Sequence, residues 1–377
     1  MRAWRVRHAR PVGVQFDWTT LYTSLALVWW WLSNFQPSVL STLSQRRSPQ
    51  ERLVPEEDIS DLIVQGLTGQ SKTHRPGVLC GRPFCVQACC DSDIVVLDHS
   101  AAVSVDDCKK CRITLGPVSG SVFLRNCKDC TVLVACQQFR ARDCSKLLVL
   151  LYCATQPIIE ACAGIEFACY QCDYPELASQ FQAAGLDVFN NNWSNVHDFT
   201  PIVGEQNWTI LTSLVPGYHP IPCNPSQPDC CDETWTEPLF SIDQQRSIVP
   251  ATLGRAYRLI GPICVVIVLS GADTDGPVRT FINEMVRCGN ILVQMKHAPL
   301  SDSHACRLLE NKASNLMDTS RDPSFFLEFN GENVVESAKD LAESLFKNFT
   351  IYISSDQATG SEDEEIFFND MDLHLSA

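Results

Sequence analysis

The chain has 377 residues, 45% of them hydrophobic, so it is long enough for two domains with substantial cores and too apolar for a disordered protein. Its net charge of −15 argues against a nucleic-acid binder.

The N-terminus has an unusual charge pattern. The first 50 residues carry six arginines and one acid, residues 18–45 hold no charge, and residues 21–35 are strongly apolar. A basic start followed by an apolar segment and a polar exit predicts a signal peptide or signal anchor. Residues 46–65 are polar and predict a linker, so residues 1–65 form an atypical N-terminal segment.

The middle of the chain contains a repeat that is marked by cysteines spaced 19, 19, 17 and 18 residues apart: Cys89, Cys108, Cys127, Cys144 and Cys162. An apolar-x-apolar pair precedes each cysteine, and alternating apolar residues follow it. Period-two segments that recur at this superperiod predict a mainly β domain, a right-handed parallel β-helix, over residues 66–211. We expect the solenoid to start near residue 78, and a short helix over 174–185 to cap it.

The 20 cysteines allow free thiols, metal sites or disulfides. Cys108, Cys111, Cys127 and Cys130 satisfy a zinc-ribbon spacing. The same four residues also occupy inward positions of consecutive coils, where free cysteine packs well as a small apolar residue. We favour a stacked ladder of thiols and expect no metal site, with structural zinc and disulfides as the alternatives.

One stretch of the repeat is polar. Between Ala135 and Cys144 the chain carries two glutamines and two arginines where neighbouring copies have small or apolar residues. Phe139 and Ala141 take inward positions, so Arg140 and Arg142 point outward. The register places Gln137 and Gln138 beside Gly120 and Ser121 of the preceding coil, and Glu160 of the next coil beside Arg142 and diagonal to Arg140.

Two interpretations of this outward face are open. An arginine that is fixed beside a carboxylate on a rigid ladder suits an external phosphate, because guanidinium is planar, permanently charged and bidentate. The alternative is an outward salt bridge between Arg142 and Glu160, which would contribute only about 0–1 kcal/mol.

The second half of the chain predicts a linker and an α/β domain. Residues 212–260 are rich in proline and predict the linker. Apolar patterns then predict strands at 263–269, 290–296, 324–329 and 349–354 and helices at 276–287, 301–316 and 333–347. This alternation indicates a ferredoxin-like α/β domain over 261–355, without a Gly-rich phosphate loop. Residues 356–377 hold seven acids and no Lys or Arg, which predicts a solvated acidic tail.

Five motifs resemble the retinitis pigmentosa 2 family, GTPase activators with a tubulin cofactor C-like domain: Asp98–Ala101, Gly116–Phe123, Ala135–Cys144, Cys153–Glu160 and Phe189–Phe199. The resemblance runs over residues 78–210, with a weaker match over 260–370. It is specific because the five motifs agree in order and spacing.

The resemblance implies a tubulin cofactor C-like β-helix followed by a domain similar to nucleoside diphosphate kinases. It implies activation of an Arf-like small GTPase, ADP-ribosylation-factor-like protein three, during trafficking of lipidated proteins to the ciliary membrane. The partner would carry the GTP and Mg²⁺, and this chain would need no cofactor of its own. Carriers of lipidated cargo are further expected partners, and the expected location is the cytoplasmic face of the plasma membrane and the ciliary base. A non-catalytic scaffold for GTP-loaded partners or cargo carriers is the alternative.

The resemblance also assigns roles to residues. The family's Gln-Gln-x-Arg motif falls on Gln137, Gln138 and Arg140, which makes Arg140 the arginine finger. An arginine supplied in trans accelerates GTP hydrolysis by roughly 10³–10⁵. Gln137 would help to place Arg140, and Glu160 would support it. The implied nucleotide-binding residues are Gly120, Ser121, Gln137, Gln138, Phe139 and Arg140, and the implied partner contacts are Arg142, Asp198 and Phe199.

The chain departs from the family pattern in two places. Family members begin Met-Gly-Cys, which allows dual acylation, but this chain has Arg2 and Ala3 there. We therefore expect an incorrect gene model or an unusual first exon, with the apolar start as an alternative anchor. Residues 323–336 resemble a nucleoside diphosphate kinase strand and turn, but the phosphate-accepting histidine motif is absent, and His374 lacks its context. We therefore expect no kinase activity and no catalysis by the isolated protein.

Overall fold

The computed structural model describes residues 59–202, 204–212, 240–254, 261–269, 274–301, 304, 308 and 323–375. The predicted signal or anchor segment, the middle of the Pro-rich linker and most of the helix predicted at 301–316 lie outside these residues. In the part of the chain that the structure describes, no helix is both long and apolar enough to cross a membrane.

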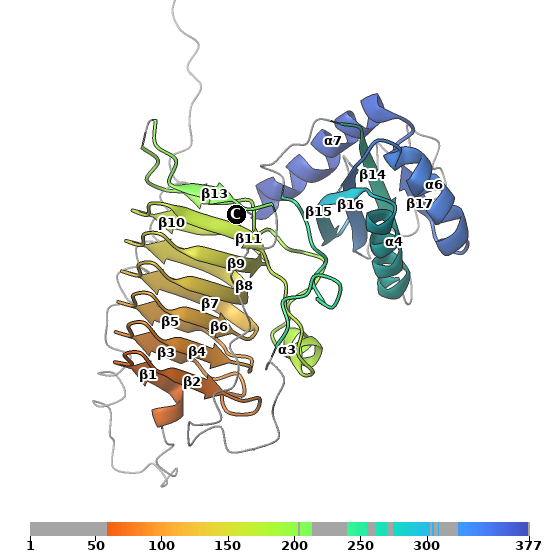
Figure 1. The fold of residues 1–377 in the computed structure, drawn as a ribbon. Coiled ribbons are helices and arrows are strands. Elements are labelled where there is room, and N and C mark those ends of the chain that lie inside the picture. The colour runs from red at the N-terminus through yellow and green to blue at the C-terminus, as the bar shows by residue number, and fades with distance from the viewer. Residues whose placement is uncertain are drawn as a thin grey trace, which may run out of the picture. The chain divides into compact units, whose positions relative to one another are not determined.

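The first part of the described chain is a β-solenoid of stacked parallel strands (Figure 1). A 3₁₀ helix, η1 (Ile59–Leu62), leads into β1 (Ile63–Gln65), β2 (Ser71–His74), β3 (Phe84–Gln87), β4 (Asp93–Val96), β5 (Val103–Asp106), β6 (Arg112–Leu115) and β7 (Val118–Arg125). The solenoid continues with β8 (Thr131–Arg142), β9 (Leu148–Cys153), β10 (Ile158–Glu160) and β11 (Ile165–Cys169), and closes with β12 (His197–Asp198) and β13 (Trp208–Ile210). The predicted β-helix is confirmed.

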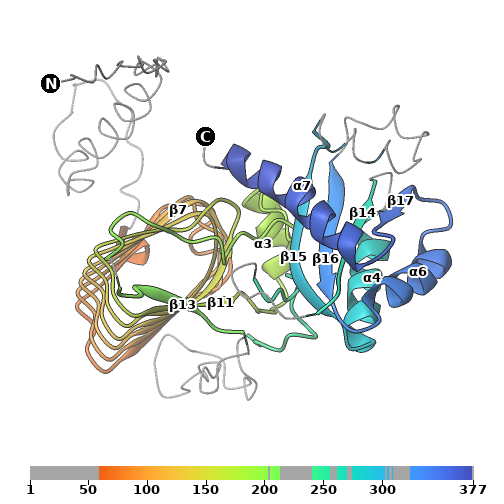
Figure 2. The same cartoon turned by 90° about the horizontal axis from the view of Figure 1, so that it is seen from above.

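The strands form two ladders that share one long strand. One ladder runs β2, β4, β6, β8, β9, β11, β13, and the other runs β1, β3, β5, β7, β8, β10, β12. The N-terminal half of β8 pairs with β6 and β9, and its C-terminal half pairs with β7 and β10. Viewed from above, the stacked coils superpose as a closed outline around the core (Figure 2).

The repeat cysteines mark one corner of each coil. The residue before each of them has a left-handed backbone, with φ of 53°, 56°, 52°, 54° and 50° at Ala88, Asp107, Asn126, Asp143 and Ala161. Asp and Asn tolerate this conformation better than other non-glycine residues. The five turns are therefore equivalent in structure, as the cysteine spacing predicts.

The cysteines of the repeat are stacked inside the solenoid. All five repeat cysteines, and Cys111 and Cys130 as well, are buried in the solenoid core as free thiols. The backbone N–H of Cys111 donates to the sulfur of Cys130 on the next coil at 3.5 Å. The predicted thiol ladder is confirmed. Among the residues that the structure describes, no group of three or more potential ligands is arranged to hold a metal ion.

The solenoid starts earlier than the sequence predicts. Strands β1 and β2 already pair with β3 and β4. The predicted start near residue 78 and the predicted linker through residue 65 are therefore wrong. This first coil lacks the repeat cysteine, so the pattern that marks the other coils does not reveal it.

A helix and a returning segment cover the outer side of one ladder. We call this side the covered face; its buried apolar outward residues include Val95, Leu133, Leu150 and Ala168. They pack in one cluster with α3 (Leu177–Ala183), and with Phe240 and Val249. The predicted helix is confirmed, but it covers the side of a ladder and does not cap the end of the solenoid. Because Phe240 and Val249 are buried, the prediction that the whole of 212–260 is a linker is wrong.

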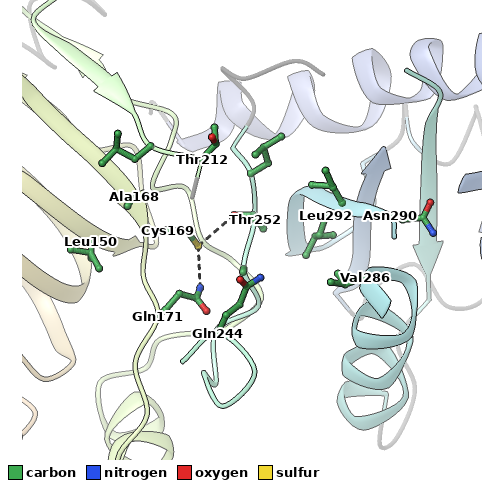
Figure 3. A pocket seen from close by; sticks show the side chains of 14 residues that line it. Leu150, Ala168, Cys169, Gln171, Thr212, Gln244, Thr252, Val286, Asn290 and Leu292 are labelled. Atoms are coloured by element: carbon green, nitrogen blue, oxygen red, sulfur yellow. Dashed lines mark hydrogen bonds between the residues drawn. The ribbon is translucent and has the colours of Figure 1, made fainter. Parts of the chain in front are cut away.

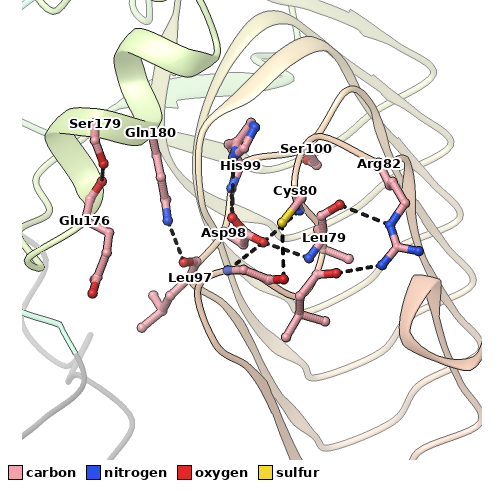
Figure 4. Close-up of polar contacts among 12 residues, drawn as sticks. Leu79, Cys80, Arg82, Leu97, Asp98, His99, Ser100, Glu176, Ser179 and Gln180 are labelled. Carbon is pink, nitrogen blue, oxygen red and sulfur yellow. Dashed lines mark hydrogen bonds and ion pairs between the residues drawn. The ribbon is translucent and has the colours of Figure 1, made fainter.

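Figure 4 shows how polar contacts fix this covering helix and the loop beside it. The Gln180 side-chain amide of α3 donates to the carbonyl of Leu97 at 2.8 Å. One oxygen of the buried Asp98 carboxylate accepts backbone N–H bonds from Gly77, Leu79 and Cys80 at 3.1, 2.7 and 2.9 Å. The motif that begins at Asp98 therefore has a structural role, because its carboxylate ties two coils together.

The second half of the described chain is an α/β module. It contains β14 (Ile263–Val268), α4 (Asp275–Arg287), β15 (Ile291–Ala298), β16 (Ser324–Asn330), α6 (Val334–Leu345), β17 (Ile351–Ile353) and α7 (Gln357–Leu375). The sheet is antiparallel, with the order β15, β16, β14, β17. Helices α4 and α6 share one core cluster with the sheet. The predicted alternation is confirmed where residues are described, and the likeness to nucleoside diphosphate kinases stays a prediction.

The acidic C-terminus packs on the other face of this sheet. Phe367 and Phe368 of α7 are buried against Val265, Ile267 and Phe326. The Asp363 carboxylate is also buried, and it accepts hydrogen bonds from the hydroxyls of Tyr352 and Ser354. The prediction of a solvated tail is wrong, because the two phenylalanines give the acidic segment an apolar face.

Candidate functional site

The two glutamines of the polar stretch lie at a corner of the solenoid. Cys136 and Phe139 are both buried in the solenoid core, although only two residues separate them. A straight strand would place residues three apart on opposite faces. The chain therefore bends at Gln137 and Gln138, where β8 passes from one ladder to the other, and Gln138 is exposed.

The corner of the preceding coil matches this bend. Ser121 pairs with Gln138, and the Ser121 hydroxyl donates to the Gln138 side-chain oxygen at 3.0 Å. A register shift between Val118 and Ser121 places Gly120 at the same corner. The predicted neighbours on the two coils are confirmed.

Close stacking of the coils requires the glycine at this corner. A Cβ at Gly120 would lie 2.5 Å from the carbonyl oxygen of Ala101 on the coil before it. Side chains do not approach a backbone oxygen that closely, so any larger residue would push the two corners apart. The predicted role of Gly120 at a nucleotide stays a prediction.

The outer side of the second ladder, which we call the uncovered face, carries two columns of register-matched residues. The central column is Ser104, Phe123, Arg140, Ile158 and His197. The charged column is Asp106, Arg125, Arg142 and Glu160. Residues within a column are about 4.8 Å apart along the ladder. The predicted outward direction of Arg140 and Arg142, and the place of Glu160 beside Arg142, are confirmed.

Ion pairs within the charged column differ from the prediction. The guanidinium of Arg125 binds both oxygens of Asp106, at 2.5 and 2.8 Å. The Nε of Arg142 lies 3.4 Å from a carboxylate oxygen of Asp143. Within the described residues no ion pair joins Arg142 to Glu160, so the predicted salt bridge is wrong. The register brings their backbones together, but Arg142 turns toward the nearer carboxylate of its own coil.

Arg140 is half-buried, although it faces outward. Burial lowers the pKa of its guanidinium, and the negative charge of Glu160 raises it. An arginine stays charged at physiological pH despite such a shift. Arg140 is therefore a cation with reduced hydration, near one exposed carboxylate.

The backbone of the glutamine corner is anchored to the next coil. The carbonyl of Gln137 accepts hydrogen bonds from the backbone N–H and the hydroxyl of Thr155, at 3.1 and 2.9 Å. The thiol of Cys153 also points at this carbonyl, at 3.7 Å. A corner that is held by three donors presents the following residues, including Arg140, in one fixed direction.

Phe139 lies inside the solenoid. Its ring is completely buried and packs edge-on against Phe167, with the ring centroids 6.0 Å apart. The predicted nucleotide-binding role is therefore wrong for this side chain. Its function is to anchor β8 in the core, so that the neighbouring Arg140 faces outward.

The predicted partner contacts lie where the uncovered face continues into β12. Phe199 is 60% exposed, and its backbone N–H donates to Ile159 of β10 at 2.9 Å. The Asp198 carboxylate accepts bonds from the Thr200 backbone and the Asn207 side chain, at 2.9 and 2.7 Å. Asp198 therefore shapes the loop, while Phe199 is free to contact another molecule.

Comparisons with known proteins agree with this geometry. The family model Tubulin binding cofactor C matches residues 81–199. Protein XRP2 of Homo sapiens is 41% identical over 321 residues, covering 84% of this chain and 89% of the relative. Protein XRP2 of Danio rerio is 40% identical and covers 84% of both chains. The chain belongs to the XRP2 family.

More distant likenesses cover less than a third of the chain. Tubulin-specific chaperone C of Homo sapiens is 42% identical over 104 residues, which are 27% of this chain and 30% of the relative. A solved structure, Tubulin Binding Cofactor C from Leishmania major, is 29% identical and covers 30% of this chain and 80% of its own, with a TM-score of 0.27. That score is too low to support an argument about the fold. The XRP2 family likeness, in contrast, extends into the α/β module.

A pocket of about 160 Å³ lies elsewhere in the molecule (Figure 3). It is lined by residues of β9, β11, α4, β15 and the segments that connect them, and by none of the predicted site residues. Three of its polar groups contact one another, since the Cys169 sulfur accepts from Gln171 at 3.6 Å and lies 3.7 Å from the Thr252 hydroxyl. The uncovered face of this XRP2 family member is therefore the stronger candidate.

Sequence reasoning missed two apolar residues of the uncovered face and one exposed apolar residue of the loop that follows β12. Phe123 and Ile158 flank Arg140 in the central column, and Ile202, 54% exposed, follows Phe199. The register that located Glu160 also locates Phe123 and Ile158. They were missed because only polar departures from the repeat were considered, and apolar residues in outward positions were not.

Proposed function

We propose that this protein is a GTPase activator for an Arf-like small GTPase of the ADP-ribosylation-factor-like protein three type, and that Arg140 enters the partner's active site in trans. The observation that carries the proposal is Arg140 itself, a half-buried cation on a rigid strand next to an anchored corner. Membership of the XRP2 family supports it.

The chemistry of GTP hydrolysis explains why this arrangement is suitable. Negative charge builds up on the transferred phosphoryl group, and a guanidinium that reaches it stabilises the transition state. An arginine on a mobile loop would first have to be ordered, whereas β8 already holds Arg140 between two paired strands. The partner would supply the GTP and Mg²⁺.

The neighbouring residues have supporting roles in this proposal. Ser121 and Gln138 form a polar edge beside Arg140, where the nucleotide or the partner's backbone would approach. Glu160 attracts and orients the guanidinium from the next coil. Arg142 and Phe199 would contact the protein surface around the nucleotide, because both belong to the exposed part of the same face.

Single-turnover hydrolysis of GTP on the purified partner tests the proposal. Wild-type protein is expected to accelerate hydrolysis by roughly 10³–10⁵, and Arg140→Ala to abolish this acceleration. Binding of the GTP-loaded partner should change little, because most of the interface is intact. Arg112→Ala is the matched control, since Arg112 is an outward arginine of the other ladder that pairs with Asp93.

Full stimulation by Arg140→Ala would refute the proposal. A non-catalytic scaffold is the second candidate, and the exposed Phe199 and Ile202 favour a binding surface in either case. A scaffold would bind the GTP-loaded partner without changing its rate of hydrolysis. The same assay therefore separates the two functions.

We extend the proposal to the cellular role that the family resemblance implies. The protein would promote release of lipidated cargo at the ciliary base and the cytoplasmic face of the plasma membrane, with cargo carriers as further partners. Imaging of a tagged full-length chain, wild type and Arg140→Ala, tests this role. Both forms should localise alike, and only the mutant should fail to support delivery of lipidated cargo.

A further inference from the structure

The residues on either side of Arg140 in the central column are apolar. Phe123 of β7 pairs with Arg140 on one side, and Ile158 of β10 pairs with it on the other. Both side chains face outward and are partly exposed. Because neighbouring parallel strands are about 4.8 Å apart, this register places the Arg140 side chain between those of Phe123 and Ile158.

This apolar flanking explains the burial of Arg140. The Nε atom of Arg140 is shielded from solvent, although the residue belongs to the uncovered face. A long arginine stem on an open ladder would remain hydrated if its neighbours were small or polar, as Ser104 is at the start of the same column. On the two adjacent strands, the residues that the register places beside this guanidinium are therefore the ring and the isoleucine.

The ring of Phe123 is itself held in place by charge. The guanidinium carbon of Arg125 lies 5.2 Å from the ring centroid, and that of Arg142 lies 5.8 Å from it. Arg125 is in turn fixed by its two hydrogen bonds to Asp106. Cation–π contacts of this kind stabilise the position of a ring. The charged column thus fixes the ring against which Arg140 lies.

From this geometry we infer that Phe123 is a positioning residue for Arg140: with Ile158 it forms an apolar slot that holds the arginine stem extended and removes water from the guanidinium before the partner binds. The inference rests on the proposed function, since it concerns the same arginine. A guanidinium that is already ordered and partly dehydrated loses less entropy and less hydration when it meets a phosphate.

The first test does not depend on activity. In the full chain, the Arg140 Nε–H signal is assigned by its absence from the NMR spectrum of Arg140→Ala, and its exchange with water is measured. We expect exchange to become at least about tenfold faster in Phe123→Ala and to stay near the wild-type rate in Ser104→Ala, because only the first change opens the slot. Equal exchange in wild type and Phe123→Ala would overturn the inference, whatever the protein's function.

The second test uses single-turnover hydrolysis at saturating protein. Phe123→Ala is expected to lower the stimulated rate by about 10- to 100-fold and to leave the half-saturating concentration within about threefold, because misplacing a catalytic group affects the rate more than binding. Phe123→Leu should restore most of the rate, since leucine still fills the slot. Ile158→Ala should have a smaller effect of the same kind.

A double mutant separates positioning from a structural defect. In the Arg140→Ala background, Phe123→Ala should cause no further loss of rate, because the group that it positions is gone. An additional loss of the full size would show that Phe123 acts without Arg140 and would overturn the inference. Full stimulation by Arg140→Ala alone would instead refute the proposed function. The exchange measurement would still show whether Phe123 shields Arg140 from water.

Discussion

Both ladders of the solenoid point apolar residues inward, but their outward residues differ in kind. On the covered face one column of outward residues is mostly apolar and is buried beneath α3 and the residues around Phe240, whereas the Asp93–Arg112 pair of the same ladder is partly exposed. On the uncovered face they carry serine, aspartate, arginine and a partly exposed phenylalanine. The inward residues therefore specify the coil, and the outward residues specify what each face contacts.

Strand β8 contributes residues to both the covered and the uncovered face. Leu133 and Ala135, in its first half, point out of the solenoid and are buried in the covering cluster. Arg140 and Arg142, in its second half, point outward into the two columns of the uncovered face. The bend at the two glutamines separates the halves. A single strand thus joins the element that stabilises the fold to the element that carries the proposed chemistry.

The largest effect should come from placing a charge on the covered face. Leu133→Asp would bury an unpaired carboxylate beneath α3, and we expect it to destabilise the protein by about 3–5 kcal/mol or to prevent folding. Arg142→Ala, on the same strand but on the uncovered face, should change the free energy of unfolding by less than about 1 kcal/mol. Chemical denaturation measures both. Similar losses of stability in the two variants would show that the two faces do not differ in burial as described.

A large-to-small change in α7 extends the comparison to the α/β module. Phe367→Ala should cost about 3–5 kcal/mol, because the ring is completely buried against the sheet. Glu365→Ala is the control, since this acid on the same helix is exposed. Thermal unfolding by calorimetry resolves the difference. A solvated acidic tail would tolerate both changes equally, which would contradict the packing of α7.

The corner glycine should show an intermediate effect. Gly120→Ala places a Cβ close to the Ala101 carbonyl, so we expect a loss of about 1–3 kcal/mol as the coils shift. Ser119→Ala, at the exposed neighbouring position, removes only a long hydrogen bond to the Ser100 carbonyl (3.4 Å) and should cost less than about 1 kcal/mol. Equilibrium unfolding in urea measures the pair. A stable Gly120→Ala protein would mean that the corner is looser than the coil stacking indicates.

The smallest effect should come from the polar edge. Ser121→Ala removes one partly exposed hydrogen bond to Gln138, which should cost no more than about 1 kcal/mol of stability. If the freed glutamine side chain becomes mobile, stimulated hydrolysis should fall by only a few-fold, because Arg140 keeps its slot. Thermal unfolding and the single-turnover assay provide the two values. A loss of stimulated hydrolysis as large as that in Arg140→Ala would instead assign the catalytic role to the polar edge.

The sequence predicted the solenoid and much of the candidate site because the repeat has a strict period. That period separates the inward Phe139 from the outward Arg140, and it pairs Ser121 with Gln138. It does not reveal the first coil, which lacks the cysteine, or the covering of one face, which comes from residues near Phe240 that are distant in sequence.

Side-chain choices within the site were less predictable than the register. Arg142 has two acids within reach, and it pairs with Asp143 of its own coil instead of the cross-strand Glu160. The acidic composition of the C-terminus concealed the two buried phenylalanines of α7. In both cases the sequence is compatible with more than one side-chain arrangement, and packing in the folded protein selects one of them.

The central claim is that the uncovered face supplies Arg140 to a partner's transition state. Binding to the partner loaded with GDP and aluminium fluoride, which mimics the transferred phosphoryl group, tests it most directly. Wild-type protein should bind this complex at least about 10²-fold more tightly than the GDP-loaded partner, and Arg140→Ala should lose most of that difference. Equal preference for the transition-state mimic in the wild type and in Arg140→Ala would contradict the claim.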